Sequence, residues 1–194
     1  MKLRKIMIAT VIIALLGGTA AYAADTGLQK LRVWINKKET DEAGVLVDGK
    51  PYLSLKAASE KLDGIFIYDD STNRASVYKP NVNMFTFRSN DMFSYVPKGS
   101  KVKFNVFSQI DSLKIDISAF KVTIDDPYGD STWIDGRDSE DKEFSDVVKE
   151  DFTFGTREIT YTFESTGRYV IRFWMKPAGE GSYQAVAEKI INSK

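Results

Sequence analysis

The stretch TGRYVIRFWMK at residues 166–176 alternates between apolar and other side chains along most of its length. Every second position on one side is apolar: Tyr169, Ile171, Phe173 and Met175. Trp174 falls on the other side of this pattern, beside Arg172. Successive side chains of a strand point to opposite faces, so a period of two predicts a strand with one buried face. Residues 169–176 therefore predict a strand that places half of its side chains in a core.

The same pattern recurs through the rest of the C-terminal part. Strand candidates span residues 84–88, 102–107, 113–117, 120–124, 152–154, 158–163, 169–176 and 183–190. Turn-forming stretches such as Ser165-Thr166-Gly167 separate them, and no helix is predicted between them. Short strands at regular spacing are typical of two packed antiparallel sheets. We therefore expect residues 81–194 to form an Ig-like antiparallel β-sandwich, with Tyr169 in a tyrosine-corner role.

Residues 25–80 indicate a smaller module that also contains strands. A strand candidate at residues 31–36 precedes two apolar runs that flank Asp48-Gly49. An Asp-Gly pair between apolar runs predicts a tight hairpin, because glycine accepts the positive φ that the turn needs. Pro80 marks the expected end of the module, because proline lacks the N–H that a continuing strand would use.

A short helix is predicted inside this module. Leu55, Ala58 and Leu62 lie at spacings that share one helix face, after Ser54 as a capping residue and before Gly64 as a stop. Two further strands follow at residues 65–68 and 74–79. The order is β-β-β-α-β-β, so we expect a mainly β protein in which a small α+β module precedes the sandwich.

The N-terminus indicates export. Residues 1–24 begin with three basic side chains, continue with the apolar run Ile6–Leu16, and end in Ala21-Tyr22-Ala23. This order is typical of a secretory signal peptide, and the apolar run is shorter than the ~20 residues that a membrane-spanning helix needs. We therefore expect a secreted or extracellular protein, without membrane insertion after the signal is cleaved.

The amino-acid composition excludes several kinds of partner, catalytic site and metal site. The chain has 27 basic and 27 acidic residues, and the residues after position 24 carry a net charge of −3. This balance argues against nucleic acid as a partner. The chain contains no histidine and no cysteine, which excludes a Ser-His-Asp triad and metal sites that use those ligands. Carboxylate, tyrosine, lysine and serine chemistry remains, or binding without catalysis, and no cofactor is expected apart from the calcium considered below.

Part of the smaller module is similar to a known family. The relevant residues are Val45–Lys56 with its Asp48-Gly49 turn, the helix region up to Gly64, Tyr68-Asp69 and the strand around Val77. They resemble the copper amine oxidase N-terminal-like domain, also called a stalk domain, of secreted and surface proteins of Gram-positive bacteria. The family pattern has Arg, Leu-Gly and Trp-Asp where this chain has Lys56, Asp63-Gly64 and Tyr68-Asp69.

That resemblance covers about a quarter of the chain, and it implies an interaction or spacer module at the Gram-positive cell envelope. It implies neither copper nor oxidation, because the catalytic domain of the oxidases, with its histidine ligands, has no counterpart in a histidine-free chain.

The most acidic stretch runs from Asp125 to Asp151 and holds eleven carboxylates against three basic side chains. Closely spaced oxygen ligands suit Ca²⁺. The calcium candidates are Asp126, Asp130, Asp135, Asp138 and Glu140. Their spacing does not fit an EF-hand, because glycine follows Asp135 directly instead of taking the sixth position of the loop. The favoured interpretation is therefore a long solvated loop, and calcium is the alternative.

Three aromatic residues are candidates for contact with a partner or ligand: Tyr128, Trp133 and Trp174. Aromatic rings beside carboxylates can stack on sugars or anchor a protein partner. For Trp133 the favoured interpretation is instead that it covers the end of the sandwich core. Trp174 is expected either to be exposed or to face the smaller module.

These observations favour a non-catalytic binding or spacer protein of the bacterial cell envelope or extracellular matrix, rather than an enzyme. The expected partner is a cell-wall polymer or a surface or secreted protein. One alternative is a secreted regulator, such as a proteinase inhibitor that acts through residues 125–151. Another is a hydrolase that uses paired carboxylates on glycans.

Overall fold

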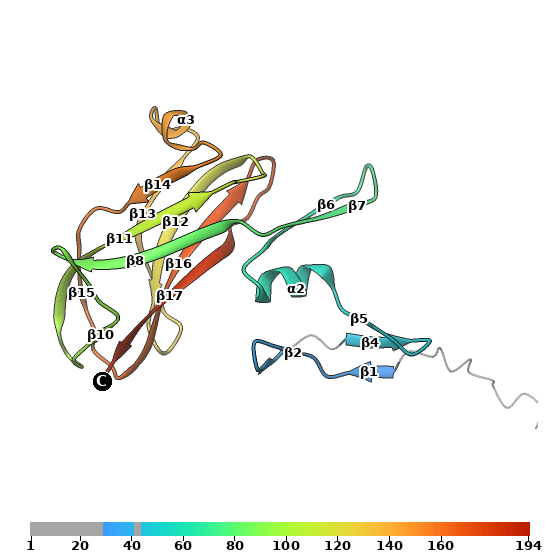
Figure 1. Cartoon of the computed structure of the whole chain (residues 1–194), viewed down its shortest axis with the longest axis horizontal. Helices are drawn as coiled ribbons and strands as arrows, with labels where there is room; N and C mark the ends of the chain where they lie inside the picture. The colour runs from blue at the N-terminus through green and yellow to red at the C-terminus, as the bar shows by residue number, and fades with distance from the viewer. Residues whose placement is uncertain (1–28, 41–43) are drawn as a thin grey trace, which may run out of the picture. The chain divides into compact units, whose positions relative to one another are not determined.

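The computed structural model describes residues 29–40 and 44–194, which form two compact units: one ends at Ser54, and the other is Leu55–Lys194 (Figure 1). The predicted signal peptide, residues 1–24, lies outside the described residues. The boundary that the sequence suggests at Pro80 falls inside the second unit. None of the helices in the described part of the chain has the length and apolar character needed to cross a membrane.

The first unit consists of two small antiparallel sheets. One has the order β1 (Gln29–Leu31), β4 (Gly44–Val47) and β5 (Lys50–Tyr52), and the other is the hairpin of β2 (Trp34–Ile35) and β3 (Lys38–Glu39). Asp48 and Gly49 have φ values of 50° and 73°, so the hairpin predicted there is confirmed. The single strand expected over residues 31–36 is wrong: β1 ends at Leu31 and β2 begins at Trp34.

The second unit begins with α2 (Leu55–Lys61), followed by the hairpin of β6 (Ile65–Asp69) and β7 (Arg74–Tyr78). The helix and both strands are as predicted, but the buried face of the helix is different. Ala57 and Ser59 are buried, whereas Leu55 and Leu62 are 54% and 49% exposed. The chain leaves the helix through Asp63, which takes a φ of 54°, and the next N–H, of Gly64, donates to the Ser59 carbonyl at 2.7 Å.

The rest of the second unit is a β-sandwich, which confirms the predicted mainly β fold class (Figure 1). One sheet has the order β10 (Tyr95–Val96), β17 (Gln184–Ser193), β16 (Gly167–Pro177), β12 (Ile117–Asp125) and β13 (Ser131–Asp138). The other has β14 (Phe152–Gly155), β11 (Lys101–Asp111), β8 (Asn81–Arg88) and β9 (Asp91–Met92), and β15 (Ile159–Thr162) also pairs with β11. All pairs are antiparallel except β10 with β17, which is parallel.

The core lies between these two sheets. Phe120 of β12 packs edge-on against Phe154 of β14 at 4.8 Å between ring centroids and stacks on Phe173 of β16 at 5.5 Å. The apolar side of residues 166–176 is buried as predicted: Tyr169, Ile171, Phe173 and Met175. Each such side chain contributes about 1.5–3 kcal/mol through removal of apolar surface from water.

Two sequence-based expectations for the sandwich are wrong. Residues 113–116 form no strand, because Leu113 turns inward as a buried residue whose N–H donates to the Glu150 carbonyl at 2.8 Å. The acidic stretch 125–151 is not one long loop, since it contains β13 and the one-turn helix α3 (Phe144–Val147). A bulge between Val122 and Thr123 places both Ile134 and Asp135 in buried positions, which breaks the alternation that would have revealed β13.

Candidate functional site

The turn between β12 and β13 holds an exposed tyrosine in a fixed position. The Asp126 carboxylate accepts hydrogen bonds from the N–H groups of Tyr128 and Asp130 at 2.8 and 2.9 Å. The Asp126 N–H donates to the Asp130 carbonyl at 3.0 Å, and Gly129 takes a φ of 95°. An aspartate that bonds its own following backbone stabilises a tight turn. The turn therefore presents the Tyr128 side chain, which is 79% exposed.

Beside this turn lies a polar hollow of about 430 Å³ at one end of the sandwich. Carboxylates, hydroxyls and tyrosine rings line it: Asp126, Tyr128, Asp130, Thr132, Tyr161, Thr162, Glu164, Ser165 and Tyr169. Three of the nine lining residues carry negative charge and none carries positive charge. The hollow therefore has a negative potential, which favours neutral or cationic ligands over anions.

The far wall of the hollow is held by the loop between β15 and β16. The Tyr169 hydroxyl accepts from the Ser165 N–H at 3.0 Å and donates to the Ser165 carbonyl at 3.3 Å. This bond to the backbone four residues upstream is the tyrosine-corner arrangement that the sequence predicts. Gly167 packs closely on Pro127, since a Cβ at Gly167 would lie 2.9 Å from the proline ring. The two loops that form the hollow are therefore packed directly against each other.

Tyr161 supplies an additional hydroxyl to the hollow. Burial raises the pKa of Tyr161 above its usual range, and the Tyr169 and Asp126 side chains add to this effect, whereas a hydrogen bond with the Thr132 side chain lowers it. The Tyr161 hydroxyl therefore remains protonated at neutral pH and is able to donate a hydrogen bond. Its ring packs edge-on against Tyr169 at 5.9 Å between centroids, which fixes its orientation.

Trp133 does not cover the end of the core, so the interpretation favoured from the sequence is wrong. It lies on the outer side of edge strand β13 and is 51% exposed. The guanidinium carbon of Arg157 lies 4.5 Å from the centroid of the Trp133 ring, and Arg157 Nε donates to the Ile134 carbonyl at 3.3 Å. Arg157 therefore covers part of the Trp133 ring and one backbone acceptor on the open edge of β13.

Trp174 lies on the same outer face, on β16, and is partly buried. Its Nε1 donates to Thr123 Oγ1 at 2.9 Å, and Thr123 is the register partner of Trp133. The Lys121 ammonium lies 5.5 Å from the Trp174 ring centroid and 4.4 Å from that of Tyr183. The ring of Trp174 thus has polar and cationic partners within its own sheet, and Tyr128 in the turn is the most exposed of the three candidate aromatic residues.

The five calcium candidates do not come together. Asp126 and Asp130 lie in the β12–β13 turn, Asp135 is buried within β13, and Asp138 and Glu140 lie at and beyond the end of that strand. The Asp135 carboxylate accepts hydrogen bonds from the N–H of Arg157 at 2.8 Å, the N–H of Gly136 at 2.9 Å and the guanidinium of Arg137 at 3.1 Å. Within residues 29–40 and 44–194, no group of three or more acidic side chains is placed to hold a metal ion.

The sequence did not identify Glu164, Thr132 and Thr162 as members of the site. Tyr161 lies within the predicted strand 158–163, and Ser165 lies in a predicted turn. A signal is present in the sequence, because Glu164 lies three residues and Ser165 two residues before the turn glycine Gly167. Loops at one end of a sandwich often gather binding residues.

Comparison with known proteins assigns the chain to no family. No family model matches the chain, and no curated protein matches it. The resemblance of residues ~28–79 to the stalk domain stays a prediction.

Proposed function

We propose that this protein is a secreted, non-catalytic binding protein that holds a glycan of the cell envelope or extracellular matrix at the end of its sandwich. The observation that carries the proposal is the exposed Tyr128 ring, which stands beside a hollow lined by carboxylates and hydroxyls. Sugars present an apolar ring face and a rim of hydroxyls, so an aromatic ring and hydrogen-bonding groups together match both of their surfaces.

The negative charges of the hollow indicate which class of glycan it is able to bind. Asp126, Asp130 and Glu164 are acceptors for sugar hydroxyl or amino groups, and bonds to charged acceptors contribute about 1.5–3 kcal/mol each. The same carboxylates repel sulfate and phosphate groups. We therefore infer a neutral or amino-bearing polysaccharide as the ligand, and not an anionic one.

The rigid turn supports a binding role for Tyr128. Ordering a flexible side chain or loop costs free energy when a complex forms, and a preformed site avoids part of that cost. The backbone around Tyr128 is already held by the Asp126 carboxylate and by the contact of Pro127 with Gly167. Binding would thus require little rearrangement of the turn.

Co-sedimentation with chitin, an insoluble and uncharged polymer of N-acetylglucosamine, tests this proposal. Tyr128→Ala should weaken binding at least about tenfold, because a central aromatic contact contributes about 1.4 kcal/mol or more. Tyr95→Ala is the matched control, since Tyr95 is 61% exposed but lies outside the hollow, and it should bind like the wild type. Equal loss in both variants, or no binding by the wild type, would contradict the proposal.

The same mixtures distinguish binding from hydrolysis. A non-catalytic protein leaves the polymer intact, so no new reducing ends should appear in the supernatant over many hours. Release of reducing ends that is lost in Glu164→Gln would show instead that the carboxylates act as catalysts.

A further inference from the structure

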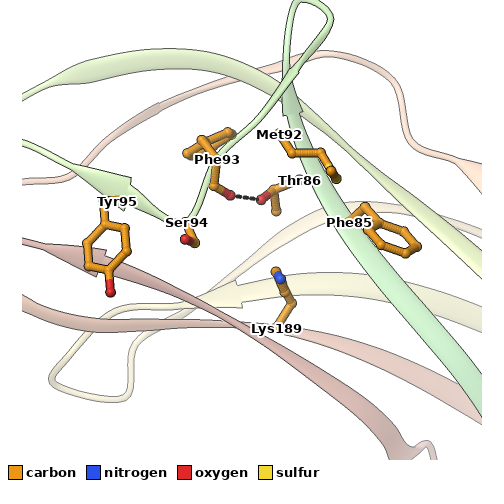
Figure 2. A pocket seen from close by; sticks show the side chains of 7 residues that line it. All are labelled: Phe85, Thr86, Met92, Phe93, Ser94, Tyr95 and Lys189. Carbon is orange, nitrogen blue, oxygen red and sulfur yellow. Dashed lines mark hydrogen bonds between the residues drawn. The ribbon is translucent and has the colours of Figure 1, made fainter.

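A second hollow, of about 530 Å³, lies at the side of the sandwich between β8 and β17. Figure 2 shows its lining, with the Lys189 side chain entering below a ring of mostly apolar residues. The residues are Phe85, Thr86, Met92, Phe93, Ser94, Tyr95 and Lys189. Met92 and Tyr95 are strongly exposed, so the hollow opens to solvent along an apolar rim.

Lys189 occupies an inward position of its strand. It is the register partner of Ile171, whose side chain is fully buried on the core side of β16. Lys189 itself is partly buried, and among the described residues no carboxylate or other acceptor bonds to its ammonium group. An ammonium group beside apolar surface attracts a carboxylate more strongly than it would in bulk water, because that surface displaces part of the screening solvent. The hollow therefore favours a ligand that brings a negative charge.

Two more basic side chains, Lys194 and Arg88, lie against aromatic rings that line the hollow. The Lys194 ammonium lies 4.9 Å from the centroid of the Tyr95 ring, and the Arg88 guanidinium carbon lies 6.0 Å from that of Phe93. Asp91 stands opposite Arg88 in the β8–β9 pair, so Lys189 and Lys194 supply the excess of positive charge. The potential of this hollow is thus opposite in sign to that of the hollow beside Tyr128.

Unpaired strand edges border the hollow. β10 pairs with β17 at Asn192 and Ser193, and the Asn192 N–H also donates to the Ser94 carbonyl at 2.8 Å. β9 pairs with β8 at Phe87 and Arg88, and the Phe93 N–H then donates to the Thr86 carbonyl at 3.1 Å. Among the described strands, the edges at the hollow left without a strand partner are those of β8 before Thr86 and of β17 before Asn192. In the described part of the chain no strand ladder joins β8 to β17. Such edges offer backbone donors and acceptors to an incoming extended segment.

We propose that the hollow between β8 and β17 binds an extended polypeptide segment of a partner protein that carries an acidic side chain flanked by apolar ones. The carboxylate pairs with Lys189, and side chains two residues before and after it contact Phe85, Met92 and Tyr95. The inward lysine also disfavours pairing with a second copy of the same edge, because two lysines would then meet.

An NMR titration of the purified protein tests this inference with short capped peptides. One peptide has a central Glu, Val two residues before and after it, and Thr elsewhere, and two others replace the Glu by Gln or Lys. The Glu peptide should bind about fivefold or more tightly than the Gln peptide and should shift the amide signals of β17 and β10. Equal affinity for the three peptides, or shifts confined to other strands, would overturn the proposal.

Charge reversal provides the control. Lys189→Glu should reverse the preference, so that the Lys peptide binds best, whereas Lys142→Glu makes the same change of charge outside the hollow and should alter nothing. If Lys189→Glu fails to fold, Lys189→Gln should abolish the discrimination between the Glu and Gln peptides. Octanoate, an apolar carboxylate without a peptide backbone, should bind more weakly than the Glu peptide. Equal binding of octanoate would show that the site is one for small carboxylates and would overturn the peptide proposal.

Discussion

The two strands β16 and β13 belong to the same sheet, yet they differ in their pairing and in the side chains that they bury. β16 pairs on both sides, with β12 and β17, and directs four large apolar residues into the core. Among the described strands, β13 pairs only with β12; it contains a bulge, exposes Trp133 and buries the carboxylate of Asp135. The central strand stabilises the sandwich, and the edge strand and its turn carry the polar groups that are available for binding.

The largest expected effect concerns the central strand. Phe173→Ala should lower the free energy of unfolding by about 3–5 kcal/mol, because Phe173 is fully buried and stacks on Phe120. Urea denaturation followed by tryptophan fluorescence measures this change. A loss below about 1 kcal/mol would mean that β16 is not the centre of the core.

A smaller effect is expected on the edge strand. Asp135→Ala should cost about 1–3 kcal/mol, because it leaves the N–H groups of Arg157 and Gly136 without their acceptor. Asp135→Asn should retain part of the stability, since an amide oxygen still accepts hydrogen bonds. Trp133→Ala is the control on the same strand and should cost less than about 1 kcal/mol, because its ring is half exposed. A larger cost for Trp133 than for Asp135 would contradict the assigned roles.

The difference between these strands also explains why β16 is predictable from the sequence and β13 is not. Strict alternation in β16 made its location and its buried face predictable. In β13 the bulge at Ile134 interrupts the alternation, and the strand lies in an acidic stretch, so the sequence indicates a loop there. Core positions follow a simple period because every inward residue meets the same apolar environment, whereas an edge strand has no such requirement on its open side.

The candidate site was only partly predictable for a related reason. Tyr128, Asp126 and Asp130 lie close together in the sequence, so an aromatic residue among carboxylates was recognisable. Tyr161 reaches the same hollow from β15, which pairs with β11 of the other sheet, and Glu164 lies in the loop after β15. Only the folded topology brings these two residues to the hollow. Pairing across the sandwich cannot be inferred from local pattern alone.

The central claim is that a glycan binds at the Tyr128 end of the sandwich. An NMR titration with soluble, uncharged oligosaccharides of N-acetylglucosamine tests it most directly, because each amide reports its own surroundings. We predict saturable shifts at residues 126–132 and 161–165, with little change along β8 and β10. Shifts confined to β8, β10 and β17, or no shifts at all at saturating glycan, would contradict the claim.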